Sequence, residues 1–208
     1  MLIVPSFRLK YNSETGVHTV FVEGCHPCPL CEGILTYRDR RLRKSKDLVG
    51  GVRLFLLRRL LCENCRKLHT EIPDIIQPYK HYDSNTIQSV LDRSVDALAC
   101  EASGSTTRRW ERDFAEAEAD INQRLASVHA REANSTAPLS MPSDPVSTIR
   151  AGIECWLAFV MRLLINSGHE LRTRFAFCPP PPSVRMEATR GIPSEGGGHH
   201  DKTTTDSG

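Results

Sequence analysis

The chain has 208 residues, of which 39% are hydrophobic and only 6% aromatic, and 26 are Gly or Pro without a fixed period. This lean composition excludes a collagen-like fold and predicts small ordered units joined to unstructured lengths. The net charge of +2 hides an asymmetry, because residues 1–82 carry +6, residues 83–133 carry −4 and the remainder is neutral. A basic unit followed by an acidic one favours a partner with phosphate groups.

The apolar stretches are too short to cross a membrane. The longest, residues 153–165, contains Glu154 and Arg162,. The first residues, MLIVPSFRLKYN, lack the basic segment and apolar core of a secretory signal,. We therefore expect a soluble, cytoplasmic protein without a membrane partner.

The first 82 residues read as a small β unit. Residues 17–22 are β-branched and aromatic between Gly16 and Gly24, which indicates a strand, and a short strand is expected at 34–37,. Residues 38–44 are predicted to form an exposed basic loop that carries Arg40, Arg41, Arg43 and Lys44. Gly50-Gly51 then separates this loop from a strand at residues 52–61,.

From Asp83 the apolar residues follow helical spacing. A first helix, capped by Asp83 or Ser84, is expected around Ile87 and Val90, followed by a second short helix at 94–101,. A turn at Ser103-Gly104 and a cap at Ser105-Thr106 predict a third helix, and the apolar stripe over 114–128 continues it as a long amphipathic helix,.

The remaining residues alternate between polar and apolar segments. By composition residues 134–148 form a linker, residues 149–177 contain a helix with a strongly apolar face over 153–164, and residues 178–208 form a disordered tail,. The fold class predicted for the chain is therefore α+β. It consists of a zinc-ribbon β unit (1–82), a helix-turn-helix-like region (83–133), a linker, a C-terminal helix and a tail.

The cysteines point to a metal. Of eight Cys, Cys28/Cys31 and Cys62/Cys65 form two C-x2-C pairs, which in a chain without a secretion signal indicate metal ligation,. Four thiolates arranged as a tetrahedron are the ligands of a structural zinc site. We therefore predict Zn²⁺ as the cofactor.

Cys25 offers a rival first pair with Cys28. The amide two residues after the first cysteine commonly donates to its thiolate, and from Cys25 that residue is Pro27, which has no N–H,. From Cys28 it is Leu30, so Cys28/Cys31 is preferred. His26 and His69 are interpreted as surface or packing residues, because four thiolates already complete the site.

The helices at 84–115 have the outline of a helix-turn-helix. The first two turns of the third helix carry Thr106, Arg108, Arg109 and Arg112, which are placed to reach phosphates and base edges of DNA,. Trp110 would hold that helix on the other two. An ordinary helical hairpin with solvated arginines explains the same spacing, and the net acidic surroundings do not separate these alternatives.

Several motifs together resemble a known family. They are Cys28-Pro29-Leu30-Cys31, Arg38-Asp39-Arg40-Arg41, 58–65 (RRLLCENC), 68–74 (LHTEIPD), 78–82 (PYKHY) and 105–110 (STTRRW). Over roughly residues 20–115 the chain resembles an uncharacterised bacterial family of domain-of-unknown-function proteins. That family looks like the N-terminal zinc ribbon and helix-turn-helix of insertion-sequence transposases. The chain differs in having Arg66-Lys67 where such zinc-binding turns often have Gly.

These observations favour a zinc-stabilised, DNA-binding protein related to mobile elements, with duplex DNA as its partner. We expect no enzyme, because no long α/β pattern positions three carboxylates after residue 134 and no phosphate-cradling glycine loop is present,. The alternative is a zinc-ribbon adaptor that binds a partner protein. The apolar faces at 114–128 and 153–164 predict that one helix covers the other or that either face forms a homodimer.

Overall fold

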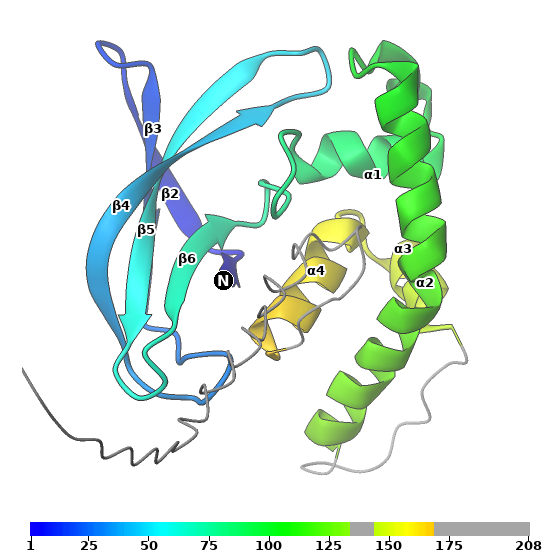
Figure 1. Cartoon of the computed structure of the whole chain (residues 1–208). Helices are drawn as coiled ribbons and strands as arrows, with labels where there is room; N and C mark the ends of the chain where they lie inside the picture. The colour runs from blue at the N-terminus through cyan, green and yellow to red at the C-terminus, as the bar shows by residue number, and fades with distance from the viewer. Residues whose placement is uncertain (134–143, 169–208) are drawn as a thin grey trace, which may run out of the picture.

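The computed structural model describes residues 1–133 and 144–168, which form a mixed six-stranded sheet with helices packed beside it (Figure 1). The α+β class predicted from the sequence is confirmed. The strands are β1 (Leu2–Val4), β2 (Phe7–Asn12), β3 (Val17–Val22), β4 (Leu35–Lys46), β5 (Val52–Cys62) and β6 (Leu68–Pro73). The helices are α1 (Ser84–Asp92), the 3-10 helix η1 (Val95–Ala99), α2 (Gly104–Ala133), α3 (Pro145–Gly152) and α4 (Trp156–Asn166).

Strand β5 organises the sheet. One of its edges pairs with β4 over almost its full length, and the other pairs with β3 in parallel near Phe55 and with β6 in antiparallel fashion near Leu60. Phe55 and Leu57 lie two positions apart, so their side chains share one face of the strand, where they are buried with Val20 and Ile72, and Leu60 is buried as well,. Strand β1 lies outermost, parallel to β6.

Residues 38–44 do not form the predicted loop. They belong to β4, which begins as expected near residue 35 but continues to Lys46 through a bulge between Tyr37 and Asp39. The many charged side chains are typical of a loop, but most of them point into solvent while the backbone satisfies its hydrogen bonds on β5,. Asp39 lies opposite Arg59 and accepts two hydrogen bonds from its guanidinium at 2.5 and 2.6 Å.

The helical region agrees with the sequence in its first element and differs in the next two. Asp83 caps α1 by accepting a hydrogen bond from the Thr86 N–H. The predicted second helix is a single 3-10 helix, η1, in which no residue is buried. Helix α2 begins at Gly104, so the predicted cap at Ser105-Thr106 lies inside its first turn. A short 3-10 segment with no buried residue is not the second helix of a helix-turn-helix, so that outline is only partly formed.

The segment after residue 143 is a pair of helices and not a single one. Asp144 caps α3 through the Ser147 N–H and Pro145 occupies its first turn, so residues 145–148, predicted as linker, are helical,. Helix α3 ends at Gly152, and α4 begins at Trp156. Residues 134–143 and the predicted tail at 178–208 lie outside the described residues, as do residues 169–177.

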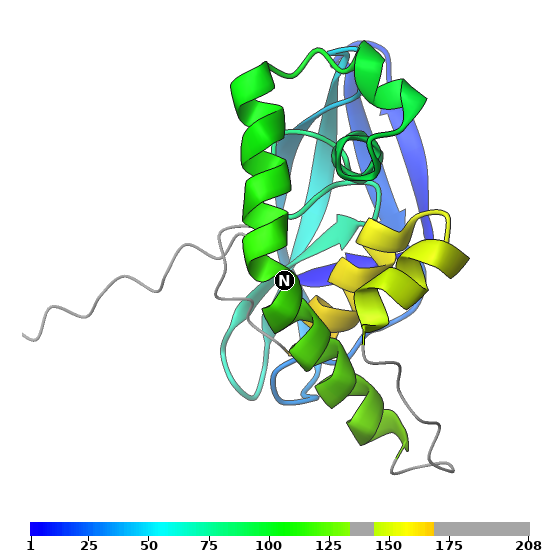
Figure 2. The same ribbon diagram turned by 90° about the vertical axis from the view of Figure 1, so that its right-hand side faces the viewer.

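Helix α4 lies between the sheet and α2 (Figures 1 and 2). Most of its apolar residues are buried because β1, α1, α2 and α3 all contact it. The predicted faces at 114–128 and 153–164 meet here, with Phe114 packed edge-on against Trp156 at 5.4 Å. Asn166 at the end of α4 bonds both the N–H and the C=O of Ile3, at 2.9 and 2.8 Å. These two bonds pair backbone N–H and C=O groups of β1 that, among the described strands, have no partner on that edge of the sheet.

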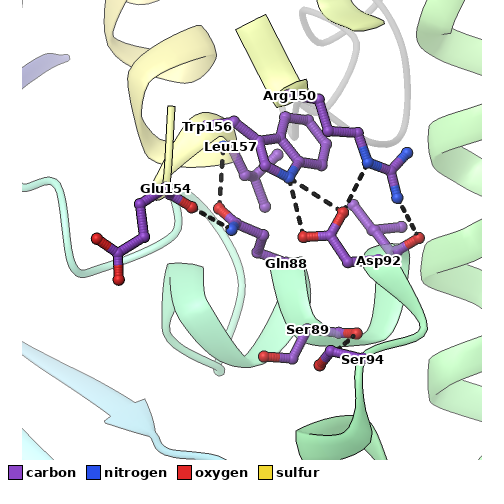
Figure 3. A network of polar contacts seen from close by, with 9 residues as sticks. Gln88, Ser89, Asp92, Ser94, Arg150, Glu154, Trp156 and Leu157 are labelled. Carbon is purple, nitrogen blue, oxygen red and sulfur yellow. Dashed lines mark hydrogen bonds and ion pairs between the residues drawn. The ribbon is translucent and has the colours of Figure 1, made fainter. Parts of the chain in front are cut away.

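A polar joint fixes α1 against α3 and α4 (Figure 3). The carboxylate of Asp92 accepts hydrogen bonds from the Trp156 indole N–H at 3.1 Å and from the Arg150 guanidinium at 2.6 Å. Gln88 accepts from the Leu157 N–H at the start of α4 and donates to the backbone carbonyl of Glu154. These bonds satisfy polar groups that would otherwise be left unpaired beside the core.

No helix in the described ranges is both long enough and apolar enough to span a membrane.

Candidate metal centre and cationic cleft

Two short loops with the same backbone pattern bring the paired cysteines together. In residues 28–33 the Cys28 N–H donates to the Gly33 carbonyl at 2.9 Å and the Glu32 N–H donates to the Cys28 carbonyl at 2.8 Å. Residues 62–67 repeat this pattern, with Cys62 donating to Lys67 at 2.9 Å and Arg66 to Cys62 at 3.1 Å. We call these loops the first and second knuckle. The first precedes β4 and the second joins β5 to β6, so the paired strands hold both knuckles at one end of the sheet (Figure 1).

The left-handed position of each knuckle is not a glycine. Glu32 and Arg66 both have φ of 58°, so Arg66 adopts the left-handed conformation for which such turns often use Gly,. Gly33 serves another purpose, because a Cβ at that residue would lie 2.8 Å from the side-chain Cγ of Asn64. The two knuckles thus pack directly against each other, and a backbone bond from Glu63 to Ile34 at 3.0 Å joins them.

The four thiols converge on one point. The ligand atoms of Cys28, Cys31, Cys62 and Cys65 all lie within 4.8 Å of one another. The Sγ atoms of Cys28 and Cys65 are 3.7 Å apart, and those of Cys31 and Cys62 are 3.5 Å apart. Tetrahedral zinc with Zn–S bonds of about 2.3 Å requires sulfur atoms about 3.8 Å apart. The cluster therefore fits a metal ion held by four thiolates, as the cysteine spacing predicted.

Backbone N–H groups of the second knuckle favour ionised sulfur. Burial opposes ionisation of Cys62, but hydrogen bonds from the N–H groups of Cys65 and Asn64, together with the Cys31 thiol, lower the pKa of Cys62 to about 7. The N–H of Lys67 likewise favours the ionised form of Cys65. Burial and the three neighbouring thiols together outweigh the Lys67 N–H and raise the pKa of Cys65, because closely spaced thiolates repel one another,. A divalent cation at the centre of the cluster removes that repulsion.

His69 is a neighbour of the cluster and not one of its four ligands. It is 2% exposed, and its Nε2 lies 3.3 Å from the Cys28 Sγ, while its Nδ1 lies 3.0 Å from the Met1 amino group. An ammonium group can only donate, so Nδ1 accepts and the ring proton is on Nε2, directed at the sulfur. Burial and the charge of the amino terminus lower the pKa of His69 and keep the ring neutral. Cys25 and His26 lie outside the four-thiol cluster.

A second feature lies toward the other end of β4. An open cleft of about 760 Å³ lies between the end of β4, the loop at residues 79–82 and the first turns of α2. We call it the β4–α2 cleft. Its cationic side chains are Lys44, Lys46, Lys80 and Arg109. The one carboxylate in its wall, Asp113, is 4% exposed and lies near Lys80 at 4.0 Å and Arg112 at 3.3 Å.

Three of the cleft cations have no acidic partner in the part of the chain that the structure describes. Within residues 1–133 and 144–168, no carboxylate forms an ion pair with Lys44, Lys46 or Arg109. Lys46 lies over the ring of Tyr82 at 5.7 Å, and that ring packs edge-on against Trp110. The cleft therefore presents positive charge to solvent beside an aromatic wall.

The match to a known protein family includes both the metal centre and the β4–α2 cleft. Residues 28–110 match the family model of DUF6431, a domain of unknown function. The resemblance to a domain of unknown function is thereby confirmed, whereas the link to transposases stays a prediction. No curated protein and no solved structure matches the chain. The DUF6431 match begins at Cys28 and ends at Trp110, so it contains all four cysteines of the cluster and the cations of the cleft.

Within the DUF6431 segment, some of the residues predicted to bind DNA come together. Lys44 from β4 and Thr106 and Arg109 from α2 line the same cleft. Arg40 and Arg41 are exposed on β4, and Arg108 is exposed on α2 outside the cleft lining. Arg112, two residues beyond the match, is engaged with Asp113 and Glu116 at 3.3 and 3.8 Å.

Arg43 does not have the role predicted for it. It is half-buried, and its guanidinium donates to the backbone carbonyls of Lys80 at 2.7 Å and Gln77 at 3.5 Å. It therefore braces the loop at residues 77–82 against β4. Sequence reasoning also missed Lys46 and Lys80. The motif at 78–82 contains Lys80 and was the available signal for it, whereas Lys46 lies in none of the motifs.

Proposed function

We propose that this chain is a zinc-stabilised protein that binds duplex DNA through the β4–α2 cleft and the basic surface around it, without a catalytic step of its own. The observation that carries the proposal is the convergence of Lys44 with Thr106 and Arg109, residues about 60 positions apart in the sequence, on one cationic cleft. Proteins gain most of their affinity for DNA by neutralising phosphates with such side chains.

The charge distribution supports a polyanionic partner. The acidic side chains of α2 are largely used within the fold, since Asp113 contacts Lys80 and Arg112, and Asp120 pairs with Arg124 at 2.9 Å. Arg40 extends the basic surface along β4 on the face of the strand that carries Lys44, whereas Arg41 faces the other side together with Arg43,. Locally, the four cationic side chains of the cleft lining outnumber its carboxylate, Asp113, although the region as a whole is net acidic.

The metal has a structural role in this proposal. Four protein thiolates complete a tetrahedral zinc site and leave no position for water or substrate, which is the arrangement of structural zinc,. Holding the two knuckles together fixes the starts of β4 and β6, and β4 in turn carries Lys44 and Lys46 to the cleft. The relation to mobile elements remains part of the prediction. The apolar faces at 114–128 and 153–164 pack against each other within the chain, which is the first of the two arrangements predicted for them.

A salt series with duplex DNA tests the proposal. Lys44→Gln and Arg109→Gln, alone and combined, should weaken binding of a random-sequence duplex and reduce the slope of log affinity against log salt by about 0.9 for each phosphate that the variant no longer neutralises. Lys10→Gln is the matched control, because Lys10 is exposed on β2 and away from the cleft. An electrophoretic shift assay provides the affinities. Equal losses in Lys44→Gln, Arg109→Gln and the control Lys10→Gln, or no binding by the unaltered protein, would contradict the proposal.

A second candidate function is a protein-interaction adaptor. It is favoured by η1, where Val95 and Leu98 are 83% and 88% exposed although both are apolar. Such residues are common at protein contacts. If no duplex is shifted, and if Val95→Ser with Leu98→Ser alters sedimentation of the protein, the adaptor explanation replaces DNA binding.

A further inference from the structure

The loop beside the β4–α2 cleft contains an aromatic residue in an unfavourable conformation. The Lys80 N–H donates to the Gln77 carbonyl at 3.3 Å, which closes a turn with Pro78 in its second position and Tyr79 in its third. Tyr79 has φ of 57°, as the third residue of a type II turn requires,. Gly or Asn normally occupies that position, because a bulky side chain in the left-handed region costs free energy.

The surrounding structure holds Tyr79 in place. The Arg43 guanidinium bonds the carbonyls of Gln77 and Lys80, which lie on either side of the turn. The Lys46 N–H also donates to the His81 carbonyl at 2.7 Å. Local strain that is held in this way concentrates at binding sites. Tyr79 lines the cleft on one side and a smaller hollow beside Arg41 and Arg43 on the other, and it is 43% exposed, so part of its side chain is open to a ligand.

The cleft combines two chemistries. Lys44, Lys46 and Arg109 supply positive charge without carboxylate partners among the described residues, and Tyr79 supplies an accessible ring. The cleft volume of about 760 Å³ is within the range of sites for small molecules and exceeds what a phosphate group alone would occupy,. Cations that contact a phosphate and an aromatic ring that stacks on a base are the combination used for unpaired nucleotides.

We propose that the β4–α2 cleft receives one unpaired nucleotide of a nucleic-acid strand, with its phosphate on Lys44, Lys46 and Arg109 and its base against the ring of Tyr79. The inference rests on the proposed function for the class of its ligand. It extends that function from the backbone of a duplex to a nucleotide outside the double helix, such as one at a strand end.

The decisive variant is Tyr79→Asn. Asn tolerates the left-handed conformation, so the turn should form as before, while the stacking surface is removed. The probe is a 5′-phosphorylated thymidine tetranucleotide, measured by isothermal titration calorimetry with the metal-loaded full chain. Tyr79→Asn should weaken its binding by about tenfold or more. Tyr37→Asn is the matched control, because Tyr37 is 60% exposed on β4 outside the cleft and should leave binding unchanged.

Two further ligands identify the source of the nucleotide. Inorganic phosphate and thymidine monophosphate should each compete with the tetranucleotide, and both should bind more weakly than the strand. Thymidine monophosphate binding as tightly as the strand would overturn the proposal in favour of a free-nucleotide site. Inorganic phosphate competing as well as the nucleotide would overturn the role of the base.

The outcome also separates this inference from the proposed function. Duplex binding that depends on Lys44 and Arg109, together with unchanged tetranucleotide binding in Tyr79→Asn, overturns the nucleotide site alone. Absence of binding to both duplex and tetranucleotide overturns both. Tetranucleotide binding that falls in Tyr79→Asn, in a protein with no affinity for duplex, supports the cleft and rejects duplex recognition.

Discussion

The two ends of β4 are built in different ways. At its start, the metal centre is formed by two knuckles of six residues each, and each knuckle closes on itself through its own backbone bonds. Near its end, the β4–α2 cleft draws on three separate segments, at 44–46, 79–82 and 106–113. A site made from local loops depends on short-range spacing, whereas a site made from distant segments depends on every contact that places those segments. Substitutions at the two ends should therefore differ in how far their effects spread.

The largest effect is expected at the metal centre. Cys62→Ser removes one of four thiolates, and structural zinc contributes about 10–16 kcal/mol of apparent binding free energy in small zinc-binding peptides. That exceeds the net stability of many domains, so the sheet should unfold when the metal is removed. Cys25→Ser should keep one zinc ion per chain, because Cys25 is exposed and outside the cluster. Metal analysis measures the zinc content of each variant, and circular dichroism measures whether its sheet is folded. Zinc absent from Cys25→Ser but kept in Cys62→Ser would show that the ligand set is wrong.

The next effect concerns the contacts that place the helices beside the cleft. Asp92→Ala leaves the indole N–H of the buried Trp156 without its partner and removes the ion pair with Arg150 (Figure 3). We expect the free energy of unfolding to fall by about 3 kcal/mol. Glu154→Ala is the control, since only the backbone carbonyl of Glu154 takes part in the joint. Its effect should stay within about 0.5 kcal/mol.

Urea denaturation and metal analysis of the same samples show whether the two ends of β4 are independent. Asp92→Ala should retain one zinc ion per chain, because the knuckles close without the helices. A variant that loses zinc together with stability would mean that the metal centre also depends on long-range packing, and the contrast between the two ends would no longer hold.

A smaller effect is expected at His69, the buried histidine beside the four-thiol cluster. His69→Phe removes the N–H directed at the Cys28 sulfur, and loss of such an outer contact commonly lowers metal affinity by about 10- to 100-fold,. His69→Gln keeps a donor and should recover part of the affinity. His26→Phe should have no effect, because His26 lies outside the four-thiol cluster. Competition with a chromophoric chelator measures all three, and equal affinities for His69→Phe and the unaltered chain would exclude a contribution from this contact.

The same contrast explains what the sequence can predict. The four ligands follow from two C-x2-C pairs, and Asp83 as the cap of α1 follows from one residue and its neighbours. The prediction of a loop at residues 38–44 is wrong. Their charged side chains can be read from the segment itself and are typical of a loop, whereas their pairing with β5 depends on residues elsewhere in the chain. The hydrogen bond from the Arg43 guanidinium to the Lys80 carbonyl could not be predicted from local sequence spacing, because the two residues lie 37 positions apart.

The smallest effect is a dependence of stability on pH at the cleft. Burial, with a smaller contribution from Arg109, lowers the pKa of Lys80 from its ordinary 10.5 to about 8, although Asp113 opposes the change. The other charged or titratable side chains that line the cleft are Lys44, Lys46, Tyr79, His81 and Tyr82. Between about pH 8 and 10.5 the unfolded chain binds more protons at this lysine than the folded chain does. Stability therefore rises with pH in that interval.

Lys80→Met isolates this contribution. The free energy of unfolding of the unaltered protein should increase relative to that of Lys80→Met, by on the order of 1 kcal/mol, as the pH rises from about 8 to about 10.5. Cysteine and tyrosine ionisation affects both proteins alike and cancels in the difference. Lys10→Met should show no such divergence, because Lys10 is exposed on β2. A phosphate ligand favours the protonated amine, so saturating nucleotide should reduce the divergence. Parallel stability curves for the unaltered chain and Lys80→Met would mean that Lys80 is charged and solvated in the folded cleft.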